Sequence, residues 1–144
     1  MKPYHKRFRH IDHRTVEATR RLMEGWSHKD LVSRHRAMRL WLDEVTSIYR
    51  LPEVAIERGM DDCYWPSLST IYMTQPSIIT LLHEFRHHYQ HHRHNVEFGA
   101  MEDDARAWSL SLYHTVAPRR FRYLVENNMV IHLDPSMRNR EVRV

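Results

Sequence analysis

The sequence predicts an α+β protein in which helices flank a small sheet. Apolar residues recur at helical spacing over residues 12–26, and again over residues 31–49 as a continuous stripe. Between residues 53 and 73 the spacing changes to that of short strands interrupted by turn residues. Helical spacing returns after residue 75. A chain of 144 residues is long enough for one such domain with its own core, so we expect a single domain over residues 1–144.

Two helices are expected before the strands. The first runs from about Asp12 to Trp26 and is ended by Gly25. Residues 27–30 (SHKD) have the form of a capping box that opens the second, which is about twenty residues long. Two helices with a tight junction also occur in helix-turn-helix proteins, but the second helix is long for a recognition helix. Its apolar stripe therefore indicates a core position.

The strands are expected around Val54–Ile56, at Cys63–Trp65 and at Ser69–Met73, and we expect them to form a three-stranded, mostly antiparallel sheet. Thr74 is the expected N-cap of the next helix, with Pro76 in its first turn. That helix should end near Asn95. The remaining expectations are helices over 101–116 and 119–127, a last strand or extended segment over 129–133, and flexible tails at 1–10 and 134–144.

Composition restricts the location and the class of the protein. Cys63 is the only cysteine, which excludes a disulfide framework and a cysteine-rich zinc site and fits a reducing compartment. No apolar run follows the charged residues 1–10, so no signal peptide is expected. No stretch is long enough to cross a bilayer. We therefore expect a cytoplasmic protein with no membrane partner.

The positive charge is concentrated in the first third of the chain. Residues 1–50 contain 12 Lys/Arg and 6 Asp/Glu, a net charge of +6, whereas residues 51–144 have a net charge of −2. The basic N-terminal helices could bind nucleic acid or an acidic partner. A solvated helix surface explains the same charge, because a basic face specifies little by itself.

The main functional signal is the pattern His-Glu-x-x-His formed by His83, Glu84 and His87. On a helix His83 and His87 stand one turn apart on one face, so both imidazoles can reach one ion. Glu84 lies beside them and could take a proton from a metal-activated water. The surrounding apolar residues predict that this helix is buried, and buried polar groups need partners such as a metal.

A catalytic zinc site normally has three protein ligands. His91 and His94 are poor candidates, because they lie about 12 Å and 16 Å from His83 along the same helix. An acidic turn is a better source, because a short loop between two helices would bring the start of the next helix towards His83 and His87. The candidates in that turn are Glu102, Asp103 and Asp104.

Residues 81–88 (LLHEFRHH) and 102–109 (EDDARAWS) together resemble the ImmA/IrrE group of gluzincin-like metallopeptidases. That group has an HExxH helix and a later helix of the form E-x-E-A-N-x-F-A. The resemblance covers about residues 30–125 and implies the minimal zincin fold. It implies that His83, His87 and Glu102 bind Zn²⁺ and that Glu84 is the general base of a zinc metallopeptidase acting on a protein or peptide.

Arg106 departs from the pattern of this family, which usually has Asn there. A guanidinium cannot accept a hydrogen bond, so the group that orients a zinc-bound histidine must come from elsewhere, with Asp103 or Asp104 as candidates. Asp103 also stays an alternative to Glu102 as the third ligand. Arg106 itself could stabilise an oxyanion or pair with a carboxylate.

The remaining expectations concern substrate binding, the oxyanion and two alternative functions. The strand at residues 69–73 could bind an extended substrate as an added strand. The second possible function is a zincin-like module that regulates by binding DNA or protein, and the third is a His-rich helix that binds metal only incidentally. Oxyanion donors could come from Tyr64, Tyr72, His114 or Tyr123.

Overall fold

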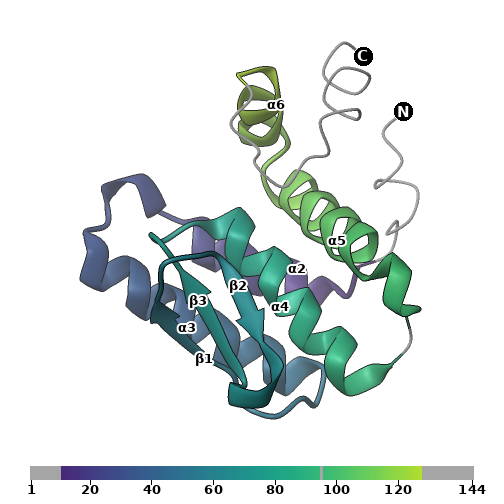
Figure 1. Cartoon of the computed structure of the whole chain (residues 1–144). Coiled ribbons are helices and arrows are strands. Elements are labelled where there is room, and N and C mark those ends of the chain that lie inside the picture. The colour runs from purple at the N-terminus through teal and green to yellow at the C-terminus, as the bar shows by residue number, and fades with distance from the viewer. Residues whose placement is uncertain (1–10, 95, 128–144) are drawn as a thin grey trace.

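A computed structural model describes residues 11–94 and 96–127, and this part of the chain is α+β. It contains five α-helices, three short 3₁₀ helices and one three-stranded sheet (Figure 1). The tails expected at 1–10 and 134–144 and the segment at 129–133 lie outside the described residues. In chain order the elements are α2 (His13–Met23), η1 (Trp26–His28), α3 (Leu31–Ile48), β1 (Ala55–Arg58), β2 (Cys63–Trp65), η2 (Pro66–Leu68), β3 (Thr70–Met73), α4 (Ile78–Arg93), η3 (Phe98–Ala100), α5 (Met101–Val116) and α6 (Pro118–Glu126).

The first two helices lie where the sequence predicts them, but α3 is capped differently. Gly25 ends the first helical segment in the left-handed conformation, with φ of +65°. Residues 26–28 then form η1, and the Asp30 side chain caps α3 by accepting a hydrogen bond of 2.8 Å from the Ser33 N–H. The expected capping box over residues 27–30 is therefore wrong, because its first half belongs to a separate 3₁₀ turn.

The sheet is mixed, which corrects the expectation of a mostly antiparallel one. Its strand order is β1-β3-β2, with β3 parallel to β1 and antiparallel to β2. Strands β1 and β2 are consecutive in the chain, but each of them pairs with β3, which lies between them. Ile71 at the centre of β3 is fully buried. This burial agrees with the central position of β3, because a middle strand has a neighbouring strand on each side.

Helix α4 carries the His-Glu-x-x-His pattern and begins three residues later than expected. Ser77 is its N-cap and accepts a hydrogen bond from the Thr80 N–H, whereas the Thr74 N–H donates to Asp62 at 2.8 Å. The expectation that Thr74 is the cap is therefore wrong. The helix ends at Arg93, close to the predicted end, and His94 is its C-cap with φ of +54°.

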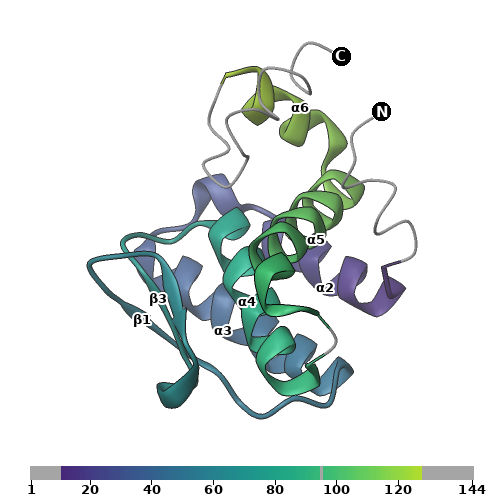
Figure 2. The same cartoon turned by 45° about the vertical axis from the view of Figure 1, so that its right-hand side comes forward.

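Helix α4 lies between the sheet and α5, as both views show (Figures 1 and 2). Phe85 on its buried face contacts both neighbouring helices. The centroid of its ring lies 5.2 Å from that of Trp41 in α3 and 5.8 Å from that of Trp108 in α5. Helices α5 and α6 agree with the predicted ranges to within one residue. Among the described residues, no helix is both long enough and apolar enough to span a bilayer.

Candidate metal centre

The two histidines of the pattern share one face of α4. Their ring centroids lie 5.0 Å apart, as expected for residues one helical turn apart. The side chain of His83 is 3% exposed and that of His87 is 17% exposed. The neighbouring Leu82 and Phe85 are fully buried and hold this helix in the core. The apolar residues of α4 therefore fix the position from which both imidazoles project.

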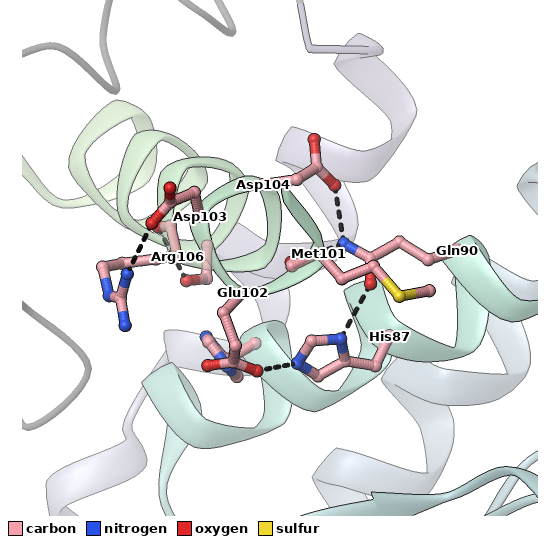
Figure 3. A network of polar contacts seen from close by, with 9 residues as sticks. His87, Gln90, Met101, Glu102, Asp103, Asp104 and Arg106 are labelled. Atoms are coloured by element: carbon pink, nitrogen blue, oxygen red, sulfur yellow. Dashed lines mark hydrogen bonds and ion pairs between the residues drawn. The ribbon is translucent and has the colours of Figure 1, made fainter. Parts of the chain in front are cut away.

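Glu102 in the first turn of α5 points to the ring of His87 (Figure 3) and also contacts His83. Its Oε1 lies 2.6 Å from His87 Nε2, and its Oε2 lies 3.4 Å from His83 Nε2. One ligand atom from each of the three residues lies within 4.8 Å of the other two. Two imidazole nitrogens and one carboxylate oxygen are a donor set that suits a catalytic zinc ion. The residues that sequence reasoning placed at a metal are thus brought together.

The two other acidic residues of this turn point elsewhere (Figure 3). Asp103 is exposed and pairs with Arg106, with 3.0 Å between Oδ1 and Nη1. Asp104 is buried and pairs with Arg86, with 2.8 Å between Oδ2 and Nε. The geometry therefore favours Glu102 over both neighbours. Arg106 thus pairs with a carboxylate, which is one of the two roles expected for it.

The electrostatics of the three residues differ because their burial and partners differ. Burial lowers the pKa of His83 and favours its neutral ring. Burial also acts to lower the pKa of His87, but hydrogen bonds with Glu102 and Gln90 outweigh it and raise that pKa. Hydrogen bonds with His83 and His87 hold the pKa of Glu102 well below its usual range. A metal would therefore displace a proton that His87 shares with Glu102.

Glu84 lies beside this group in a cavity of about 640 Å³. Burial raises the pKa of Glu84 to about 7, against the opposing effects of His87 and of the backbone of Tyr64. The cavity is bordered by α4, by the start of α5 and by β2 with the residues next to it. A carboxyl group with a pKa near neutrality can both accept and release a proton there.

Of the four expected oxyanion donors, only Tyr64 lines this cavity. Its hydroxyl oxygen lies 2.8 Å from Nδ1 of His88, whose Nε2 lies 2.8 Å from the carbonyl oxygen of Pro52. Because that carbonyl only accepts, Nε2 carries the proton and Nδ1 accepts from the Tyr64 hydroxyl. The Tyr64 proton is thus already used, and Tyr72, His114 and Tyr123 do not line the cavity.

The expectation for the strand at residues 69–73 is also wrong. Strand β3 is paired on both sides, so neither of its edges can accept an added strand. Strand β2 is the edge strand that borders the cavity. A sequence pattern gives each strand but not its neighbours, which is why the central strand was mistaken for an edge.

Sequence reasoning also missed residues around the site. His91 is not part of the three-residue metal group, as its distance along α4 predicts, but it does line the cavity. Gln90 is buried and bonds Nδ1 of His87 through its Oε1 at 2.8 Å. The three-residue step from His87 to Gln90 along the helix was the available signal for this contact.

Comparison with protein-family models, with curated protein sequences and with solved structures finds no match to this chain.

Proposed function

We propose that this protein is a zinc-dependent metallopeptidase of the minimal zincin type that acts on a protein or peptide. The observation that carries the proposal is the convergence of His83, His87 and Glu102 beside the buried Glu84. Two of these residues come from α4 and one from α5, so the packing of the two helices builds the group. The HExxH spacing alone has little specificity, and the carboxylate from a second helix adds to it.

Each residue has a role that follows from its position. His83, His87 and Glu102 would hold the zinc ion, which when bound lowers the pKa of a water molecule and polarises a carbonyl group. Glu84 lines the same cavity and would accept the proton of the attacking water and pass it to the leaving amine. The buried position of Glu84 keeps bulk water from competing for that proton.

The position of β2 supports a peptide as the substrate. As an edge strand next to the cavity, it can pair with an extended chain through its backbone groups. Tyr64 of this strand lines the same cavity as Glu84, so that edge lies close to the proposed base. The carbonyl groups of an extended peptide bound to this edge would lie near His83, His87 and Glu102.

Nucleic-acid binding by the first helices has less support from the described residues. Residues 11–50 contain eight Lys/Arg and six Asp/Glu, a net charge of +2. Several of the arginines there pair with acidic side chains, namely Arg14 with Asp12, Arg20 with Glu17 and Arg21 with Glu44. These pairs weaken the positive field that nucleic acid would need.

The proposal is tested by Glu84→Gln, which keeps the shape of the side chain but removes its basicity. We expect the native protein to contain one zinc ion and to cleave an unfolded protein such as casein. Glu84→Gln should lose cleavage while keeping its zinc content, measured by elemental analysis. Glu53→Gln, at an exposed position outside the cavity, is the matched control and should cleave as the native protein does.

Retained cleavage by Glu84→Gln would refute the mechanism. Zinc binding without cleavage of unfolded protein by the native chain would instead favour the zincin-like binding module.

A further inference from the structure

We propose that Gln90 is a positioning residue that fixes the tautomer of His87, so that Nε2 of this ring faces the metal with a free lone pair. The inference rests on the proposed metal site. It depends on a buried hydrogen-bond chain that joins α4 to α5 and ends at His87 (Figure 3). The members of this chain are Arg86, Asp104, Gln90 and His87.

The neighbours of Gln90 determine the orientation of its amide. Its side chain is 1% exposed, so each polar atom must find a partner within the protein. The amide nitrogen lies 2.9 Å from the carbonyl oxygen of Met101 and 2.8 Å from Oδ2 of Asp104. Both partners are acceptors, so only the NH₂ group can occupy this position. The reverse orientation would place the amide oxygen against two other oxygens.

The orientation of Gln90 in turn determines which nitrogen of His87 carries a proton. The amide oxygen lies 2.8 Å from Nδ1 of His87 and can only accept a hydrogen bond. Nδ1 must therefore be protonated. Without a metal, Nε2 also faces an acceptor, the carboxylate of Glu102, so the ring can carry a proton on each nitrogen. A metal ion would displace the proton on Nε2 and leave the one that Gln90 holds on Nδ1. Nε2 is the atom that lies 2.6 Å from Glu102 and forms part of the candidate metal group. A histidine that binds a metal through one nitrogen commonly donates from the other in this way.

The far end of the hydrogen-bond chain holds Gln90 in place. Asp104 accepts from Arg86 at 2.8 Å through Nε and at 3.4 Å through Nη2. The guanidinium of Arg86 lies over the rings of Tyr89, at 4.3 Å, and Trp108, at 5.5 Å. Arg86 and Asp104 are both 8% exposed, so this pair is shielded from solvent. Asp104 thus acts on His87 through Gln90.

The first test requires no metal and is made in the Glu102→Ala variant, because that variant lacks the carboxylate that competes for a proton on Nε2. Long-range ¹H–¹⁵N spectra, taken at alkaline pH where the ring holds one proton, report the tautomer of His87. We expect the Glu102→Ala protein to hold this proton on Nδ1. Adding Gln90→Met, which replaces the amide with an apolar side chain of similar length, should move the proton towards Nε2. Adding Asp103→Asn, in the exposed pair, is the control and should keep the proton on Nδ1. A folded protein with Glu102→Ala and Gln90→Met that still holds the proton on Nδ1 would overturn the inference.

The second test measures zinc affinity by competition with a chelator. Gln90→Met should bind zinc about 10- to 100-fold more weakly, as is typical when a partner of a metal-bound histidine is lost. Gln90→Glu keeps an acceptor at Nδ1, and a proton on its other oxygen can be donated to Asp104 in place of the amide. This variant should therefore keep the tautomer and bind zinc more tightly than Gln90→Met. If Gln90→Met fails to fold, loss of the Nδ1 proton in a folded protein with Glu102→Ala and Gln90→Glu would overturn the inference. A native protein that binds no zinc would refute the proposed metal site, while the spectra would still decide whether Gln90 fixes His87.

Discussion

Glu102 and Asp103 are adjacent carboxylates in one helical turn, yet only one of them reaches the histidines. Successive residues on a helix point about 100° apart, so the orientation of α5 decides which of them faces α4. Glu102 contacts both imidazoles, and Asp103 extends to the surface and pairs with Arg106. The two residues therefore provide a matched pair for testing the third ligand.

We expect Glu102→Gln to weaken zinc binding by more than about 100-fold. The loss should exceed that in Gln90→Met, because Glu102 is a charged ligand itself, whereas Gln90 only hydrogen-bonds to a ligand. Asp103→Asn should leave the affinity unchanged, because its carboxylate lies outside the group. Isothermal titration of zinc into the two variants and the native protein measures this difference. Equal losses in both variants would contradict the assignment of Glu102.

How far each site residue could be predicted depends on what positions it. His83, Glu84 and His87 lie on one helix, so their spacing alone determines their relative placement. The choice of Glu102 came from a resemblance to a family and not from spacing, and the geometry favours the same residue. The contact between Gln90 and Asp104 depends on the packing of α5 on α4, which no local pattern contains.

At the scale of elements, the helices and strands were predictable because each has a local period, whereas their caps and pairing were not. Residues 74–77 (TQPS) contain two residues that can cap a helix, Thr74 and Ser77, and local sequence does not determine which of them is the cap. The hydrogen bond that the Thr74 N–H donates to Asp62 decides between them, and it joins residues twelve apart. Strand pairing is also long-range, which explains why the parallel contact between β1 and β3 was missed.

The assignment of the cap is testable by stability. Ser77→Ala should lower the free energy of unfolding by about 0.5–2 kcal/mol, because it removes the acceptor for the Thr80 N–H at the start of α4. Thr74→Ala should cost less than about 0.5 kcal/mol, because it removes only an exposed hydrogen bond of 3.3 Å from the hydroxyl to Asp62 and keeps the one from the backbone N–H. Urea unfolding followed by circular dichroism measures both. A larger loss for Thr74→Ala would mean that the cap is at residue 74.

At the scale of the whole molecule, α4 is part of both the core and the candidate site. Phe85 contacts α3 and α5 on one side of the helix, and His83 and His87 meet Glu102 of α5 on another. An ion held by residues of both helices would bind the folded protein and not the unfolded chain. Metal binding and the stability of the whole fold should therefore be linked.

This linkage predicts that zinc raises the melting temperature. At a free zinc concentration about 100 times the dissociation constant, the stabilisation is about 2.7 kcal/mol, which corresponds to roughly 5–10 °C for a chain of this size. Differential scanning calorimetry with and without a chelator measures the shift. Glu102→Gln is the control because it keeps every histidine, including His91, His92 and His94 beyond the site. The shift should disappear in that variant, since the carboxylate that joins α5 to the metal is gone. An equal shift in the native protein and in Glu102→Gln would show that zinc binds to other histidines.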